Sequence, residues 1–299
     1  MFDLNSLPQL IRRDIEYGET HFPAIPEETP PVLDIDPSWK RQWLAAKIRL
    51  EQGPPSTESW DSKRKHYLAR YLAVAGLAEF EMIVLGCTYA ATHYEMPPAW
   101  RACLIKQAYE DMQHAASYIT RGCKLSGEDY WNGIDDVPYR ENIKQYYHPI
   151  LHRDLGGFFA AVGLHTEAYP AETNILDPFA FDPVLVHWMP NEIAEEAGHL
   201  TFLYPAMHDY LHSGTLEEQD RRKRQMVADN ETLLATALAS NRKNAETFLI
   251  GKLGMNPGVM EAFAYIPERT RFIFRTIGIE ESYWPEYLRQ NRESSTNSN

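Results

Sequence analysis

Four stretches of this chain have helical periodicity, and each of them places a carboxylate among apolar residues. These carboxylates are Glu79, Asp111, Glu167 and Glu196. Burying a carboxylate has a high desolvation cost unless an ionic partner compensates its charge. A chain with four such residues is therefore constrained to pack its helices so that the carboxylates meet around cations. We expect one carboxylate-rich site that holds two metal ions.

Two of these carboxylates are followed by a histidine three residues further along the chain. The pairs are Asp111 with His114 and Glu196 with His199. Residues three apart emerge from the same face of a helix, about one turn from each other. One such pair is a weak signal, because similar pairs occur on solvated helices, but two pairs together with two further inward carboxylates favour a metal site. The predicted metal ligands, which are also the predicted catalytic residues, are Glu79, Asp111, His114, Glu167, Glu196 and His199.

The place of each acidic residue on its helix decides whether it is a ligand candidate. Over residues 59–91, Glu79 lies on the apolar stripe of the predicted helix, whereas Glu81 lies on its polar face. Glu79 is therefore preferred as the ligand, and Glu81 stays the alternative. Glu192 lies one turn before Glu196, and it is either an additional ligand or a first-turn carboxylate that the helix dipole favours.

The second and fourth predicted helices contain the two histidines. Over residues 98–122, Asp111 lies on the inner face and Glu110 on the outer face, so Asp111 is preferred as the ligand. His114 lies toward the flank of the same helix. The fourth helix either begins at Pro190 or is kinked there.

The third predicted helix, over residues 152–169, has small residues on the face that leads to its carboxylate. Gly156 and Gly163 precede Glu167 at helical spacing. These small residues either leave space for oxygen or substrate, or allow a neighbouring helix to pack closely. His165 flanks Glu167 and is predicted to support the site or the fold rather than to bind metal.

No stretch alternates apolar and polar residues as a half-buried strand does, so the sequence predicts an all-α fold. Between the second and third helices, residues 125–150 are irregular and aromatic. They predict a long crossover, whose aromatic residues either line a pocket or pack in the core. The expected organisation is a proline-rich arm with a short helix over 1–58, a four-helix unit over 59–214, a helical extension over 215–293 and a disordered tail over 294–299.

Composition limits the partners of the chain. The formal net charge is −13, which disfavours binding to nucleic acid or to an anionic membrane surface. The basic run 221–224 is either a solvated helix face or a docking patch for an acidic partner. Cys87, Cys103 and Cys123 have no metal-binding spacing and are expected to be buried, reduced thiols. Without a signal peptide or 18 uninterrupted apolar residues, we expect a cytoplasmic protein that does not span a membrane.

The pattern of ligands resembles the ferritin-like di-iron carboxylate family, in which two helices each contribute one Glu and two others each contribute a Glu-x-x-His pair. The resemblance covers about residues 60–212. The stretch from Glu196 to Tyr204 is similar to the oxygenase branch, which includes phenylacetyl-CoA epoxidase subunits and arylamine N-oxygenases. Two positions depart from the family: Asp111 replaces the more usual Glu, and Glu192 stands where N-oxygenases have an extra histidine.

The resemblance implies a ferritin-like four-helix bundle with a long crossover and additional N- and C-terminal helices. It also implies a non-haem di-iron oxygenase that uses O2 as co-substrate and two external electrons to hydroxylate or N-oxygenate a small organic substrate. Oxygen-rich ligands with one imidazole per metal favour two iron ions, or manganese, over zinc. The sequence has no dinucleotide fingerprint and no cysteine-rich iron–sulfur motif, so a separate ferredoxin or reductase is the expected electron donor.

Other functions are compatible with the same residues. A di-iron cluster also supports aldehyde deformylation or peroxidase chemistry. A non-catalytic helical binding or assembly subunit could retain a vestigial metal site, and the proline-rich arm is compatible with a homodimer. Metal content separates the enzymes from the binding subunit, because the enzymes need two irons per chain, as the di-iron family does.

Overall fold

Helices form the architecture of the part of the chain that the computed structural model describes, namely residues 28–53, 60–131, 141, 143–173 and 177–290. No strand occurs among these residues, which confirms the predicted all-α class. The longer helices are α2 (Pro37–Gln52), α3 (Ser62–Glu79), α4 (Leu85–His93), α5 (Pro98–Ser126), α10 (Leu185–His212), α11 (Leu216–Asn244) and α12 (Ile266–Thr276). The short helices are α7 (His148–Leu151), α8 (Leu155–Phe158), α9 (Pro170–Thr173) and α13 (Glu286–Gln290). Most of the predicted N-terminal arm and the whole predicted tail lie outside the described residues.

Four long helical segments, called rods, form the centre of the fold. The first two rods form an antiparallel hairpin that contains α3 and α5. A π-helical turn, Phe80–Val84, connects α3 to α4, so that the predicted helix over 59–91 is one rod with a π turn inside it. A Cβ atom added to Gly76, on α3, would lie 2.5 Å from a backbone carbonyl oxygen of α5. A Cβ atom added to Gly122, on α5, would lie 2.6 Å from a backbone carbonyl oxygen of α3. The two glycines therefore allow the two backbones to approach closely.

The second pair of rods consists of α10 and a helix formed by α8 and a π-helical segment. This segment, Phe159–Ala168, continues directly from α8. An added Cβ would lie 2.6 Å from the hydroxyl oxygen of Tyr210 at Gly156, and 3.2 Å from the sulfur of Met207 at Gly163. The small residues of this rod thus serve close packing against α10, which supports the packing explanation over an open channel.

The ends of the helices follow signals in the sequence. The Asp36 side chain accepts hydrogen bonds from backbone amides at the start of α2, and Gly53 ends that helix with a φ of 76°. Thr215 and Glu218 form a reciprocal capping box at the start of α11. Pro190 lies inside α10 and does not begin it.

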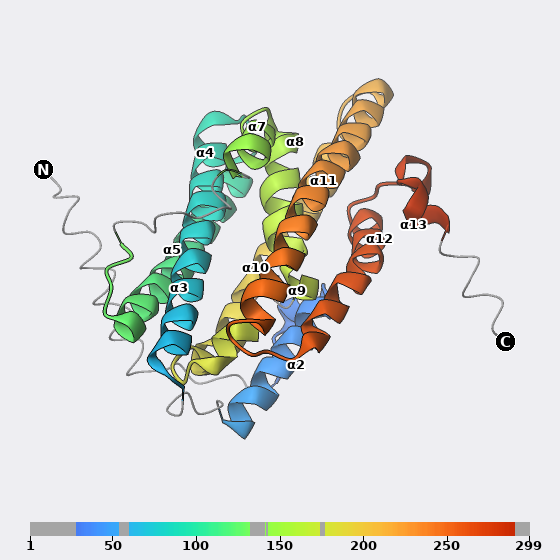
Figure 1. The fold of residues 1–299 in the computed structure, drawn as a ribbon. Helices are drawn as coiled ribbons and strands as arrows, with labels where there is room; N and C mark the ends of the chain where they lie inside the picture. The colour runs from blue at the N-terminus through green and yellow to red at the C-terminus, as the bar shows by residue number, and fades with distance from the viewer. Residues whose placement is uncertain (1–27, 54–59, 132–140, 142, 174–176, 291–299) are drawn as a thin grey trace, which may run out of the picture.

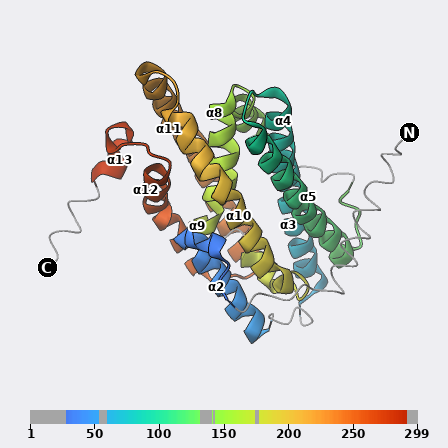
Figure 2. The ribbon, with the colours of Figure 1, turned by 180° about the vertical axis from the view of Figure 1, so that it is seen from behind.

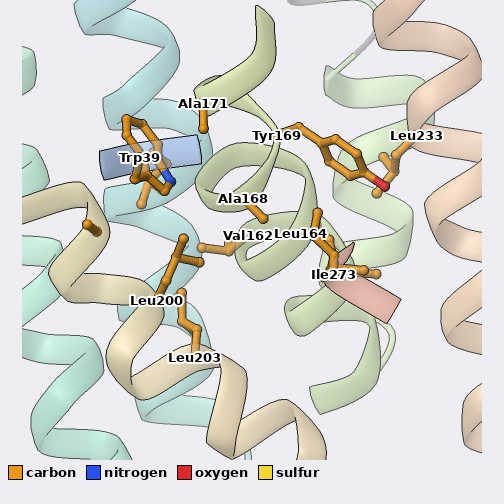
Figure 3. Close-up of a cluster of buried hydrophobic side chains, with 14 of the residues drawn as sticks. Trp39, Val162, Leu164, Ala168, Tyr169, Ala171, Leu200, Leu203, Leu233 and Ile273 are labelled. Carbon is orange, nitrogen blue, oxygen red and sulfur yellow. The ribbon is translucent and has the colours of Figure 1, made fainter. Parts of the chain in front are cut away.

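The four rods lie side by side, and further helices cover them (Figures 1 and 2). α2 packs against α10, and α11 packs along the π-helical segment that follows α8. Figure 3 shows this segment enclosed by its neighbours. The surrounding side chains include Trp39 from α2, Leu200 and Leu203 from α10, Leu233 from α11 and Ile273 from α12. One apolar core therefore joins the four rods to the helices before and after them.

One helix among the described residues, Ser62–His93, is long and apolar enough to cross a membrane by length and composition. Half of its apolar stretch is buried inside the structure, where the helix packs against α5. The core helix of a bundle has the same length and composition. The cytoplasmic location stays a prediction.

Two aromatic residues in the described part of the crossover, Tyr130 and Tyr147, pack within apolar clusters of the core. Tyr130 is 4% exposed and Tyr147 is 2% exposed. The hydroxyl of Tyr147 donates a hydrogen bond of 2.9 Å to the carbonyl of Met82, which lies in the π turn after α3. This contact ties the crossover to the first rod and supports the core-packing explanation of these aromatic residues.

The cysteines and the basic run have structural surroundings. All three cysteines are free; Cys87 is buried, as predicted, whereas Cys103 and Cys123 are only partly buried. Three side chains of the run 221–224 pair within the chain: Arg222 with the carbonyls of Tyr210 and Ser213, Lys223 with Glu280, and Arg224 with Asp220. These contacts within the chain account for most of the basic run, so that it does not require a docking partner from another molecule.

Candidate metal centre

The six side chains predicted to be ligands meet between the four rods. They form two groups that share Asp111 and Glu196, and within each group one ligand atom per residue lies within 4.8 Å of the others. The first group, called the Glu79 position, comprises Glu79, Asp111, His114 and Glu196. The second group, called the Glu167 position, comprises Asp111, Glu167, Glu196 and His199. The centre therefore offers two adjacent cation positions with two carboxylates in common.

Two kinds of helical geometry bring these carboxylates inward. Glu79 is the last residue of α3, directly before the π turn, and Glu167 lies in the last turn of the π-helical segment. π turns of this kind are frequent at functional sites. Asp111 and Glu196 lie within the regular helices α5 and α10. Their spacing of three residues from a histidine places each pair on one helix face.

Both imidazoles turn Nδ1 toward the carboxylates. His114 Nδ1 lies 3.0 Å from Oε1 of Glu196, and His199 Nδ1 lies 3.0 Å from Oε2 of Glu167. Each Nδ1 is also 3.7 Å from Oδ1 of Asp111. One imidazole nitrogen is therefore available to each cation position.

The outer nitrogen of each imidazole meets a glutamate on the opposite helix. His114 Nε2 lies 2.8 Å from Oε2 of Glu195, and His199 Nε2 lies 3.3 Å from Oε2 of Glu110. A carboxylate in this place fixes the tautomer and orientation of a metal-binding histidine. The expectation that Glu110 lies on the outer face is corrected, because its side chain is only 16% exposed and reaches across to α10.

The sequence contains a signal for these two supporting glutamates. Glu110 and Glu195 each directly precede a predicted ligand carboxylate, so that both helices contain the motif acid-acid-x-x-His. Adjacent residues on a helix point about 100° apart, and the first acid therefore lies on the flank of the metal-facing side. From there each glutamate reaches the histidine of the other helix.

The centre is buried, and many of its oxygen atoms have no hydrogen-bond partner. Asp111, His114 and Glu167 are 0% exposed. Both carboxylate oxygens of Asp111, and one each of Glu79 and Glu167, lack a hydrogen-bond partner among the described residues. Buried oxygen atoms without a partner cost free energy of folding, and native proteins usually pair them with a hydrogen-bond donor or an ion. The residues present therefore fit a pair of cations.

Of the six side chains in the centre, all but Glu196 have a raised pKa and therefore hold a proton more readily than usual. Burial, together with repulsion from Glu196, raises the pKa of Glu79 and of Glu167 well above the usual range. Burial raises the pKa of Asp111 to about 7. Burial opposes protonation of the two histidines, but the surrounding carboxylates outweigh it and raise the pKa of both imidazoles. Protons partly balance the carboxylates here, and two cations would supply the same kind of charge.

The structure supports neither explanation that the sequence offers for Glu192, namely an additional ligand or a first-turn carboxylate. α10 begins at Leu185, so Glu192 lies beyond its first turn and the helix-dipole explanation does not apply. It belongs to neither ligand group. Its side chain is nevertheless buried, and neither oxygen has a hydrogen-bond partner among the described residues. Burial raises its pKa to about 8, and the charge of His114 acts in the opposite direction.

Two other residues considered from the sequence lie outside the centre. Glu79 belongs to a ligand group and Glu81 does not, in agreement with the preferred choice. His165 belongs to neither group, as expected, and its Nδ1 has no hydrogen-bond partner among the described residues. Burial lowers the pKa of His165 to about 4, so its imidazole is neutral at pH 7.

In comparisons with known proteins, no family model, curated protein or solved structure matches this chain. A function for the centre therefore rests on the chemistry of its own residues. The relevant observations are the two ligand groups, their shared carboxylates and the glutamates that support the histidines.

Proposed function

We propose that this chain is a ferritin-like, non-haem di-iron oxygenase that holds two iron ions between its four rods and oxygenates a small organic substrate with O2. One observation carries the proposal: two ligand groups, buried except for the partly exposed Glu79, share Asp111 and Glu196, and each group contains one imidazole. Two rods supply a single Glu, and the other two supply a carboxylate-x-x-His pair. This distribution matches the ligand pattern of ferritin-like carboxylate proteins.

The donor set suits iron or manganese. Each position has three carboxylates and one imidazole, whereas zinc sites more often use thiolates and imidazoles. The four carboxylates have a total charge of −4, and two divalent cations would add +4, so that the loaded centre is neutral when the imidazoles are neutral. This balance matters because an uncompensated buried charge is strongly destabilising.

The protein side chains and the metals have separate tasks in this proposal. When bound, the iron pair supplies the redox chemistry that reduces O2. Insertion of one oxygen atom consumes substrate, O2, two electrons and two protons, and it yields oxygenated product and water. The electrons come from a separate ferredoxin or reductase. Glu110 and Glu195 hold the two imidazoles in orientation, and the buried surroundings limit the access of water.

Metal content is the first test of the proposal. Protein produced with sufficient iron is expected to contain about two irons per chain, as the di-iron family does. Asp111→Ala and Glu196→Ala each remove a shared carboxylate, and we expect both variants to lose iron and oxygenase activity together. Glu217→Ala, at an exposed position of α11, is the control. A wild-type protein without metal, or full activity in either ligand variant, would overturn the proposal.

The reaction itself is tested with reduced, iron-loaded protein. Candidate amines, acids and thioesters are mixed with this protein and isotopically labelled O2, and products are identified by mass spectrometry. We expect a product that contains one labelled oxygen atom, and no such product after the iron is removed by a chelator. Aldehyde deformylation or peroxide consumption without labelled organic product would replace oxygenation by the corresponding alternative.

A further inference from the structure

Two segments outside the four rods contact the backbone of Glu167 and of the next residue, Ala168. The indole nitrogen of Trp39, on α2, donates a hydrogen bond of 3.2 Å to the carbonyl of Glu167. The guanidinium of Arg269, on α12, donates two hydrogen bonds of 2.9 and 2.6 Å to the carbonyl of Ala168. Two successive carbonyls at the end of this rod are thus held by side chains from the N-terminal and C-terminal parts of the chain.

These donors are held in place by a buried ion pair. Arg269 and Asp36 form two hydrogen bonds of 2.6 Å each, and both residues are at most 2% exposed. The hydroxyl of Tyr204, on α10, donates a hydrogen bond of 2.8 Å to Asp36. Asp36 also caps the helix that contains Trp39. The network therefore connects α2, α10 and α12 behind the Glu167 rod.

The end of this rod depends on donors from outside itself. The π-helical segment ends at Ala168, and Pro170, two residues later, has no amide hydrogen to donate. The last carbonyls of any helix lack intrahelical partners unless side chains or water supply them. Rigid, buried donors at this point determine how the last turn, with Glu167 in it, is oriented.

We propose that Asp36, Trp39 and Arg269, together called the Glu167 support, position the Glu167 carboxylate for the cation that it shares with His199. The inference rests on the proposed dinuclear function and extends it to segments outside the four rods. Glu167 belongs to only one of the two ligand groups. The support therefore acts on the Glu167 position and leaves the Glu79 position unchanged.

Two tryptophans of α2 allow a matched test. Trp39→Phe removes the hydrogen bond to Glu167 and keeps an aromatic ring in the core. Trp43 is one turn away and equally 1% exposed, but its indole nitrogen has no hydrogen-bond partner among the described residues, so Trp43→Phe is the control. Anaerobic titration of metal-free protein with Co(II), followed by absorbance and calorimetry, measures the two dissociation constants.

Trp39→Phe is expected to weaken the binding of one Co(II) ion about 10-fold or more, which is the usual effect of removing a group that orients a metal ligand. The affinity for the other Co(II) ion is expected to change less than about threefold. Trp43→Phe is expected to change neither beyond about threefold. A double-mutant cycle assigns the effect: Trp39→Phe adds no loss in a Glu167→Ala background and retains its full loss in a Glu79→Ala background.

Arg269→Lys gives a second test if Trp39→Phe fails to fold, because it keeps the charge and loses the fork of donors. Thermal unfolding of the metal-free variants reports the fold separately from Co(II) binding. Equal Co(II) affinities in Trp39→Phe and Trp43→Phe, or equal losses at both cations, would overturn the support and leave the proposed function intact. A wild-type protein that binds no Co(II) would overturn both.

Discussion

Glu192 shows how one side chain can oppose folding and favour metal binding. Its carboxylate is buried, lacks a hydrogen-bond partner among the described residues and lies outside both ligand groups. Without cations, the neighbouring charges of Glu196, Glu195 and Asp111 repel it. With two cations in the centre, the same charge is attracted to them. Glu192 is therefore expected to destabilise the metal-free protein and to strengthen cation binding.

The Glu192→Gln variant tests this expectation through the pH dependence of stability. Burial raises the pKa of Glu192 from 4.5 to about 8, so unfolding of the metal-free protein releases its proton between these values, and stability is lost as pH rises through this range. The loss by pH 8 is on the order of 4 kcal/mol. Denaturant unfolding at pH 5 and pH 8 should therefore show a smaller difference in Glu192→Gln than in the wild type.

Glu95→Gln, at an exposed position, is the control for the Glu192 substitution and should unfold like the wild type at both pH values. The same Glu192→Gln protein should bind Co(II) more weakly, since a negative charge near the cations is gone. A Glu192→Gln protein with an unchanged pH dependence would show that Glu192 is ionised to the same extent in the folded and unfolded states.

The supporting glutamates lead to a second prediction for single residues. Glu110 is 16% exposed and also pairs with Lys106, whereas Glu195 is 41% exposed. A supporting hydrogen bond that is shielded from water orients a histidine more firmly. Glu110→Gln should therefore weaken the binding of one Co(II) ion about 10-fold, and Glu195→Gln should weaken Co(II) binding less. Calorimetric titration of both variants compares them, and a larger effect of Glu195→Gln would contradict the role of burial.

At the scale of the elements, the close crossing of α3 and α5 sets the distance between their ligands. Gly76 lies three residues before Glu79, and its missing side chain faces the carbonyl of Ala115, the residue after His114. Whatever separates these two helices at Gly76 also separates Glu79 from His114. The π turn directly after Glu79 adds a local irregularity that a regular helix would not have.

Gly76→Ala is expected to destabilise the fold and the Glu79 position together. The added Cβ would lie 2.5 Å from the Ala115 carbonyl oxygen, so the helices must move apart. The cost of such overpacking is about 1–3 kcal/mol. Thermal unfolding and Co(II) titration measure the two effects.

Gly198→Ala is the matched control, since Gly198 lies between Glu196 and His199 and an added Cβ there meets nothing within 4 Å. That variant should keep both Co(II) affinities and gain up to about 1 kcal/mol from the higher helix propensity of alanine. Loss of Co(II) binding in Gly198→Ala alone would contradict the packing argument.

At the scale of the molecule, one apolar core and one buried polar network join the four rods to the surrounding helices. Asp36 and Arg269 are 233 residues apart in the sequence and form the ion pair behind Glu167. The carboxylates of the centre repel one another without cations, so folding and metal binding are coupled. Cations should therefore stabilise the whole fold and not only their immediate surroundings.

Metal addition is expected to raise the thermal unfolding temperature of the whole chain. A ligand that binds only the folded state stabilises it by about 2.7 kcal/mol at 100 times its dissociation constant. Scanning calorimetry of metal-free protein with and without Co(II) measures the shift, and a chelator should reverse it. Asp111→Ala should show little shift, because both positions lose a ligand; an equal shift in this variant would place the Co(II) elsewhere.

The periodicity of single helices was sufficient to identify the candidate ligands. Whether Glu79 or Glu81 faces inward depends on their place relative to apolar residues within one segment, and that place is a property of the local sequence. The all-α class follows in the same way from the absence of strand alternation. Metal identity and oxygen chemistry stay predictions, because they come from the resemblance and the donor types.

Only the tertiary structure decided which of these groups touch. Asp111 and Glu196 belong to both ligand groups, Glu110 reaches the histidine of another helix, and Trp39 holds the backbone of Glu167 from 128 residues away. These contacts depend on how closely the rods cross and on how their π-helical turns rotate the side chains. Local periodicity determines the face of a helix, whereas packing between distant segments determines what that face meets.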